Sequence, residues 1–208
     1  KHGIKISHEL ITQLNTCDTF YFSIAFINKS GLAVIKQALI DLKDKGIRGK
    51  IITSTYLEFN HPNVFKELLM FDNIEVRIFE NEQIGFHPKG YIFKHNNNFD
   101  IIVGSSNLTQ SALSTNQEWN IKIKANICDD IVTEIIDEFN MQWFHSIPLT
   151  KSWISEYEKI YVPKIAIPTI KHQNIQPNLM QQEALTSLTT LRNNHKNKAL
   201  LISATGTG

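Results

Sequence analysis

The stretch that decides the fold comprises residues 86–118 and reads FHPKGYIFKHNNNFDIIVGSSNLTQSALSTNQE. It predicts two strands, a Gly-Ser-Ser-Asn corner and a short helix. The first strand begins near His87 and continues through residues 91–93. Three asparagines predict a hairpin turn into the apolar strand of residues 100–103, and a short helix is expected over residues 107–113.

Five polar side chains of this stretch carry the candidate chemistry. His87 and Lys89 lie two positions apart, so on a strand they point to the same side. Ser105 and Asn107 stand in the corner after the second strand, and Glu118 opens another strand-like run. A histidine, a lysine, an amide and a carboxylate can hold and attack one phosphate without a metal ion. Each motif alone is a weak signal, since His-x-Lys arises often by chance and Gly-Ser-x-Asn is an ordinary turn.

The flanking sequence alternates between helical and extended patterns. Strands are expected at residues 19–27, 50–55, 74–79 and 118–124, and helices at residues 9–15, 32–43, 64–70 and 131–144. Ser30 is the expected N-cap of the second helix. This alternation predicts an α/β fold in which helices cover the sheet.

Composition places few further limits on function. The chain has 208 residues, 42% hydrophobic and 20% charged, with a formal net charge of +1, which is typical of a globular protein. Global charge neither favours nor excludes nucleic acid. Cys17 and Cys128 lack CxxC spacing and are expected to be buried free thiols of a cytoplasmic protein. No apolar run approaches the ~20 residues that span a membrane.

His87-x-Lys89, Gly104-Ser105-x-Asn107 and Glu118, in this order, resemble the phospholipase D superfamily, and most of all its single-motif nucleases. The resemblance covers roughly residues 1–150. It implies an α/β fold with a mixed β-sheet flanked by helices on both faces. Many members carry an aspartate five residues after the lysine, where this chain has Lys94, and nuclease-type members often lack it too.

The expected mechanism needs no metal and no cofactor. A neutral imidazole nitrogen of His87 can attack a phosphodiester and form a covalent phosphohistidine. Lys89, Ser105 and Asn107 would stabilise the oxygens, together with backbone N–H groups at the start of the helix expected at Asn107. Glu118 would accept a hydrogen bond from the other His87 nitrogen, although a solvated charge at a strand end is the alternative.

The resemblance also implies that two motifs face each other, and this chain holds one. We therefore expect a homodimer in which the partner copy of His87 acts as the acid. The expected activity is DNA cleavage by an endonuclease. An inactive DNA-binding or dimerising arm is the alternative, and phospholipid hydrolysis is a third interpretation, disfavoured because the sequence lacks a membrane-binding stretch.

The remaining sequence resembles the start of a superfamily-two helicase. Residues 151–174 are expected to form a linker with one short helix, at residues 151–161. Residues 175–208 are expected to be the stub of an ATP-binding domain, with a helix at residues 176–192 and a strand at residues 198–203. Gln181 belongs to a Q-like motif, and Thr205, Gly206, Thr207 and Gly208 resemble an opening Walker A loop. ATP and Mg²⁺ would serve a longer protein, because the Walker lysine is absent from this chain.

Most tryptophans, lysines and histidines outside these motifs are expected to have structural or surface roles. Trp119 and Trp143 are expected in the core. Lys94, Lys122 and Lys124 either line a DNA path or form a solvated face. Surface or structural roles are expected for the remaining histidines, which are His8, His61, His95, His145, His172 and His195.

Overall fold

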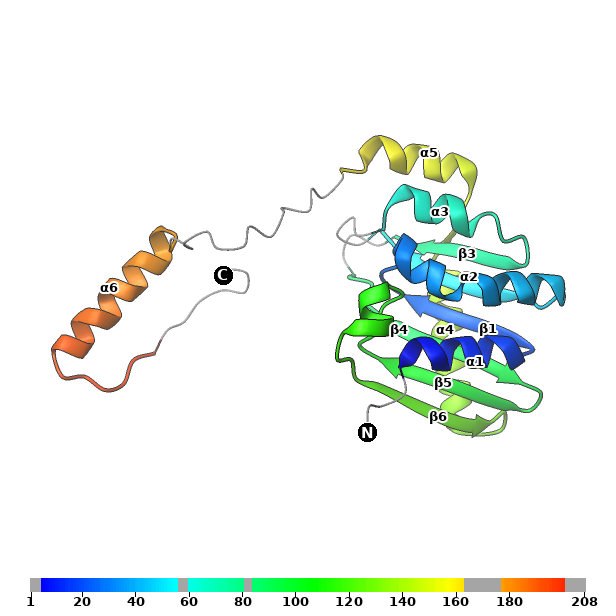
Figure 1. Cartoon of the computed structure of the whole chain (residues 1–208), viewed down its shortest axis with the longest axis horizontal. Coiled ribbons are helices and arrows are strands. Elements are labelled where there is room, and N and C mark those ends of the chain that lie inside the picture. Colours follow the sequence, from blue (N-terminus) through cyan, green and yellow to red (C-terminus); the bar gives the residue numbers. More distant parts are fainter. Residues whose placement is uncertain (1–4, 56–59, 81–83, 163–176, 201–208) are drawn as a thin grey trace. The chain divides into compact units, whose positions relative to one another are not determined.

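The computed structural model describes residues 5–55, 60–80, 84–162 and 177–200. The chain divides into two compact units, Lys1–Lys164 and Ile165–Gly208, and each is described by itself. The described strands all belong to the first unit, and the second contains the described helix α6 (Figure 1). The described helices include none that is long and apolar enough to cross a membrane.

The strands described in the first unit form one mixed sheet in the order β6-β5-β4-β1-β2-β3-β7 (Figure 1). Strands β1, β2 and β3 are parallel, whereas β4, β5 and β6 follow β1 as an antiparallel meander and β7 pairs antiparallel with β3. The strand bounds are β1 Thr19–Ile24, β2 Gly49–Ser54, β3 Ile74–Phe79, β4 Lys89–His95, β5 Asn98–Gly104, β6 Asn120–Asn126 and β7 Ile147–Pro148. The predicted mixed α/β sheet is confirmed.

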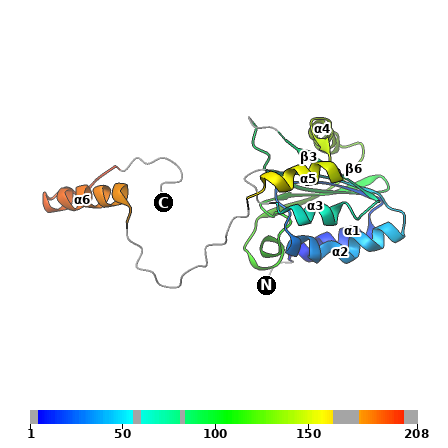
Figure 2. The same cartoon turned by 90° about the horizontal axis from the view of Figure 1, so that it is seen from above.

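Helices cover both faces of this sheet (Figure 2). Helices α1 (Ile6–Thr16), α2 (Lys29–Asp44) and α3 (Pro62–Leu68) lie on one face, and α4 (Asp130–Phe144) lies on the other. Two apolar clusters fill the layers, because neighbouring strand residues point to opposite faces. Ile51 packs towards α2, whereas Ile52 belongs to the cluster under α4.

The boundary expected at residue 150 differs from the structure. Helix α5 (Lys151–Ile160) packs on α3, and the Trp153 ring lies 5.1 Å from the Phe65 ring. Ile154 and Tyr157 are buried in the larger core cluster. This helix therefore belongs to the first unit rather than to a linker.

Two local expectations in the first unit were also wrong. The N-cap of α2 is Asn28, whose Oδ1 accepts a 2.7 Å hydrogen bond from the Gly31 amide, and Ser30 lies inside the helix. Cys128 is exposed, whereas Cys17 is buried as expected. Burial raises the pKa of the Cys17 thiol to about 11.

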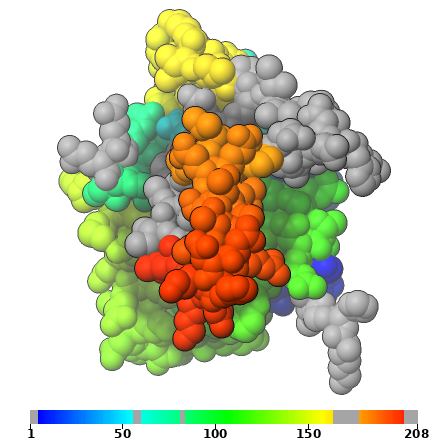
Figure 3. Space-filling view, turned by 90° about the vertical axis from the view of Figure 1, so that its left-hand side faces the viewer, coloured from blue at the N-terminus to red at the C-terminus, as the bar shows by residue number. Residues whose placement is uncertain are grey.

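In the second unit, α6 (Leu179–Asn193) begins with a capping box in which Asn178 and Gln181 exchange side-chain and backbone hydrogen bonds. No residue of α6 is buried (orange to red in Figure 3). The strand expected at residues 198–203 is absent over residues 198–200, and residues 201–203 lie outside the described residues. Thr205, Gly206, Thr207 and Gly208 also lie outside them.

Candidate active site

The candidate residues gather at one end of the sheet. The pairing register places Ile24, at the end of β1, opposite Lys89, at the start of β4. On the next strands, Gly104, at the end of β5, pairs with Asn120, at the start of β6. The segments that carry His87, Ser105 and Glu118 therefore meet at the same end of the sheet, although they are far apart in sequence.

His87 and Lys89 are in direct contact. The Lys89 ammonium donates a 2.9 Å hydrogen bond to the main-chain oxygen of His87, and Nζ lies 2.9 Å from Nδ1 of the His87 ring. The ring of Phe26 packs edge-on against the imidazole, with 5.4 Å between ring centroids. The exposed imidazole of His87 thus contacts both the Phe26 ring and the Lys89 ammonium.

This environment shifts the pKa of both groups. Partial burial, and then the Lys89 charge, lower the pKa of His87 below its ordinary value. Burial likewise lowers the pKa of Lys89, while the negative charge of Glu118 opposes this shift. This lowered pKa favours the neutral imidazole, which is the form that can act as a nucleophile.

Glu118 contacts Ser105 and Asn116 rather than His87. Ser105 Oγ donates a hydrogen bond to Oε2 of Glu118, and Nδ2 of Asn116 donates to Oε1 at 3.2 Å. The expected hydrogen bond between Glu118 and the His87 ring is not among the contacts of the described residues. Glu118 instead fixes the Ser105 hydroxyl and acts on Lys89 through its charge.

The segment around Asn107 differs from the expected helix start. Oδ1 of Asn107 accepts a 3.3 Å hydrogen bond from the Phe26 amide, and the Leu108 amide donates to the Phe26 carbonyl at 3.1 Å. The helical turn η2 begins only at Ser111 and ends at Thr115. The backbone donors predicted at a helix start on Asn107 are therefore not available, although the Asn107 side-chain amide nitrogen still can donate.

Tyr91 and Asn120, which the sequence patterns did not indicate as site residues, hold the corner of residues 104–107 through hydrogen bonds to Ser106. The buried hydroxyl of Tyr91 donates a 2.8 Å hydrogen bond to the carbonyl oxygen of Ser106. Nδ2 of Asn120 donates to the Ser106 hydroxyl at 2.9 Å. Because Ser106 lies between Ser105 and Asn107 in the chain, these two hydrogen bonds set the position of both neighbours. The i, i+2 spacing of Tyr91 from Lys89 was the available signal.

Gly104 completes the corner by allowing close approach. A Cβ atom at this position would lie 2.1 Å from the Trp119 carbonyl oxygen and 2.4 Å from Oδ1 of Asn120. The Ser105 amide donates to that same Trp119 oxygen at 2.9 Å, and the Trp119 amide donates to Ser105 Oγ at 3.0 Å. The Trp119 side chain is 88% exposed, so its expected place in the core was wrong.

The part of the chain that the structure describes contains no group of three histidine, cysteine, aspartate or glutamate side chains placed to hold a metal ion. The site does hold two donors suited to an anion, the Lys89 ammonium and the Asn107 side-chain amide nitrogen. Lys122, one of the lysines considered for a DNA path, is instead paired with Glu9 and Asp100.

Comparison with known proteins places the chain in a family. The family model described as "Cardiolipin synthase, PLD-like domain" matches residues 10–143. Similar solved structures include NucT from Helicobacter pylori, with 15% identity, a TM-score of 0.54 and coverage of 68% of this chain and 89% of that chain. No curated protein matches the chain.

Two further structures have the same fold. A phospholipase D family member, Nuc from Salmonella typhimurium, has 18% identity and a TM-score of 0.52, covering 68% of this chain and 88% of that one. Phosphatidylserine synthase of Haemophilus influenzae Rd KW20 has 14% identity and a TM-score of 0.61, covering 96% of this chain and 46% of that one. At these identities the likeness establishes the fold alone.

Proposed function

Because this chain belongs to the phospholipase D-like domain family, we propose that it is a metal-independent phosphodiesterase that cleaves DNA through a covalent phosphohistidine. The observation that carries the proposal is the contact between His87 and Lys89. Ser105 and Asn107 lie at the same end of the sheet. The lowered pKa of His87 supplies a neutral nucleophile beside a cation. No cofactor takes part in this scheme.

In the first step a ring nitrogen of His87 attacks phosphorus, so that a P–N bond forms and one P–O ester bond breaks. The Lys89 ammonium and the Asn107 amide stabilise the negative charge on the non-bridging oxygens, whereas the Ser105 hydroxyl, expected to do the same, gives its one proton to Glu118. The leaving alkoxide takes a proton from a general acid. Water then breaks the P–N bond, which releases the phosphate monoester and restores the imidazole.

The general acid is proposed to come from a second copy of the chain. One copy supplies one His-x-Lys motif, and an isologous two-fold contact would place two His87 rings opposite each other. In this homodimer one His87 attacks, and the partner's His87 donates the proton to the leaving oxygen. Glu118 holds the Ser105 hydroxyl and partly offsets the charge of Lys89.

The tail motifs support a second, separate proposal, that the domain works within an ATP-dependent helicase. Gln181 would contact the adenine, and residues Thr205, Gly206, Thr207 and Gly208 would begin a phosphate-binding loop for ATP and Mg²⁺. In the structure the Gln181 side chain caps α6. The test is nucleotide binding by the helicase that this proposal supposes, with and without Gln181→Ala. Equal affinity would remove the adenine-binding assignment.

Cleavage of DNA in excess EDTA tests the main proposal. We expect the parent chain to cleave and His87→Ala to be inactive. The matched control is His8→Ala, which removes an exposed imidazole from α1 and should leave the activity unchanged. Full activity in His87→Ala, or activity that requires Mg²⁺, would contradict the proposal.

One observation favours a second candidate, an inactive DNA-binding arm. The His87 ring contacts no carboxylate among the described residues, because Glu118 is engaged by Ser105 and Asn116. An imidazole without that partner is a weaker base. DNA binding by the parent chain without cleavage under any condition would favour this candidate.

A further inference from the structure

A hollow that is lined in part by Glu118 adjoins the candidate active site. It has a volume of about 520 Å³ and lies between the start of α1, the turn η2 and the strand β6. Its lining includes the apolar residues Ile6, Ile102 and Leu113, of which Ile6 alone is more than marginally exposed, and the polar residues Asn116, Gln117 and Glu118. We refer to this space as the β6 hollow. It shares Asn116, Glu118 and Asn120 with the candidate active site, whereas His87, Lys89 and Ser105 do not line it.

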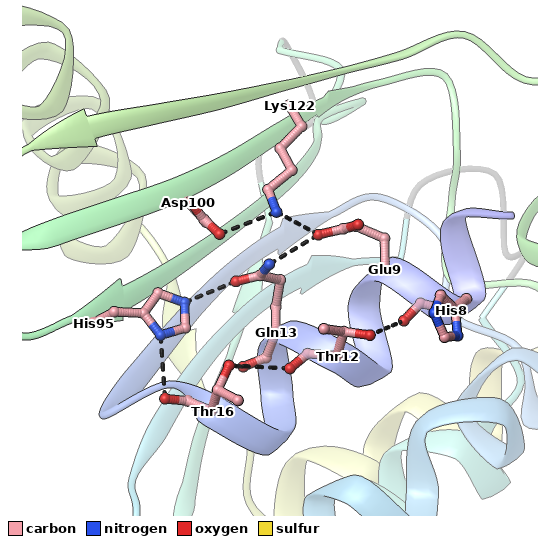
Figure 4. A network of polar contacts seen from close by, with 8 residues as sticks. All are labelled: His8, Glu9, Thr12, Gln13, Thr16, His95, Asp100 and Lys122. Atoms are coloured by element: carbon pink, nitrogen blue, oxygen red, sulfur yellow. Dashed lines mark hydrogen bonds and ion pairs between the residues drawn. The ribbon is translucent and has the colours of Figure 1, made fainter. Parts of the chain in front are cut away.

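The charged side chains around the β6 hollow carry no net positive charge, because Lys5 and Lys122 lie among three carboxylates, those of Glu9, Asp100 and Glu118. Figure 4 shows Lys122 between the carboxylates of Glu9 and Asp100, with Nζ at 2.5 Å from Glu9 Oε1 and 3.1 Å from Asp100 Oδ2. The hydrogen bond from Lys122 lowers the pKa of Glu9, and the hydrogen bonds to the two carboxylates outweigh burial and raise the pKa of Lys122. With Glu118 on the opposite wall, the hollow offers no net positive charge to a phosphate.

The same lining suits a neutral, flat ligand with a polar edge. Ile6, which is partly buried, provides apolar surface for one of its faces, and the exposed Gln117 carboxamide can both donate and accept hydrogen bonds at its edge. The volume falls in the range of small-ligand sites. A nucleobase has these properties, and amide side chains are among the groups that read base edges.

The position of the hollow links it to the strand that would be cleaved. Glu118 forms its inner wall and accepts a hydrogen bond from Ser105, so the hollow begins one side chain away from the phosphate-binding groups. A base inside a duplex is stacked on both faces and cannot enter such a space. We propose that the β6 hollow binds one unstacked nucleobase next to the scissile phosphate, so that the substrate is single-stranded or unpaired DNA. This inference rests on the proposed function.

The test compares two strands of equal length and charge, an oligothymidylate and a fully abasic strand. Their binding to the full chain carrying His87→Ala is measured by fluorescence anisotropy in EDTA, where cleavage does not interfere. We expect the oligothymidylate to bind about tenfold more tightly than the abasic strand. Adding Gln117→Ala should bring this ratio close to one without changing the affinity for the abasic strand.

Two further variants sharpen the result. Thr115→Trp places a large ring at a residue that lines the hollow and should also abolish the ratio. Gln110→Ala removes an exposed carboxamide from the same segment, outside the hollow, and should preserve it. A ratio of one in the parent, or an unchanged ratio in both Gln117→Ala and Thr115→Trp, would overturn the proposal.

The outcome is separable from that of the proposed function. If the parent chain cleaves no DNA but the ratio behaves as expected, the base site stands and the catalytic proposal fails. If the parent cleaves DNA in EDTA and the ratio is one, the catalytic proposal stands and the base site fails.

Discussion

Replacing Tyr91 with phenylalanine removes a single oxygen atom and should loosen the corner that holds Ser105 and Asn107. The Tyr91 side chain is 0% exposed, and its hydroxyl is 2.8 Å from the Ser106 carbonyl oxygen. Burial, and then the nearby charge of Glu118, raise the pKa of this hydroxyl far above its ordinary value. The shift favours the protonated hydroxyl, which is the form that donates this hydrogen bond.

The expected cost follows from the burial of both partners. A typical internal hydrogen bond contributes about 0.5–1.5 kcal/mol, and leaving a buried acceptor unsatisfied costs about 1–3 kcal/mol. Because Ser106 is also 0% exposed, no water replaces the lost donor without a rearrangement. We expect Tyr91→Phe to lower the free energy of unfolding by about 2 kcal/mol.

Urea unfolding of the full chain, followed by circular dichroism, measures this change. The control is Tyr21→Phe, which removes a hydroxyl from a partly exposed ring that packs on Phe139 in the other cluster. That variant should stay within about 0.5 kcal/mol of the parent. An equally small effect of Tyr91→Phe would show that the hydroxyl does not hold the corner, and the positioning role would have to be abandoned.

Three further predictions concern the site and its rim. Lys89→Met should raise the pKa of His87 part of the way towards its ordinary value, since burial remains the larger cause of the shift; a nuclear magnetic resonance titration that finds no rise would refute the coupling. Gly104→Ala should lower the free energy of unfolding by about 2 kcal/mol because its Cβ would meet the Trp119 backbone, whereas Gly90→Ala meets only the Ser23 oxygen at 3.9 Å and serves as the control in the same urea experiment. Trp119→Ala should change the stability by less than about 0.5 kcal/mol, and a large loss on thermal unfolding would mean that the indole is packed.

The sheet could be predicted from sequence because its signals are local. Residues 74–79 alternate between buried and less buried positions, and they form β3 with the expected bounds. The helical spacing of apolar residues in α4 likewise reports the face that it buries. Such patterns depend on neighbours within a few positions along the chain.

The active-site corner could not be predicted in the same way, because distant partners determine it. The amides of Ser105 and Leu108 are taken by the carbonyls of Trp119 and Phe26, so no helix begins at Asn107. The hydrogen bond from Tyr91 to Ser106 spans 15 residues. None of these pairs has a signature in its own segment.

Trp119 illustrates a second limit. Its size and apolar character favour the core, but it precedes β6, the edge strand of the sheet. Ile121 on β6 is also exposed. Hydrophobicity alone therefore does not identify which end of an edge strand a helix will cover. That information lies in the position of α4.

The covalent intermediate tests the central claim most directly. The chain is mixed with DNA in excess EDTA, quenched at alkaline pH to protect the phosphoramidate bond, digested, and analysed by mass spectrometry. We expect a nucleotide attached to His87 and no adduct in His87→Ala. Cleavage without any adduct, or an adduct on a residue other than His87, would contradict it.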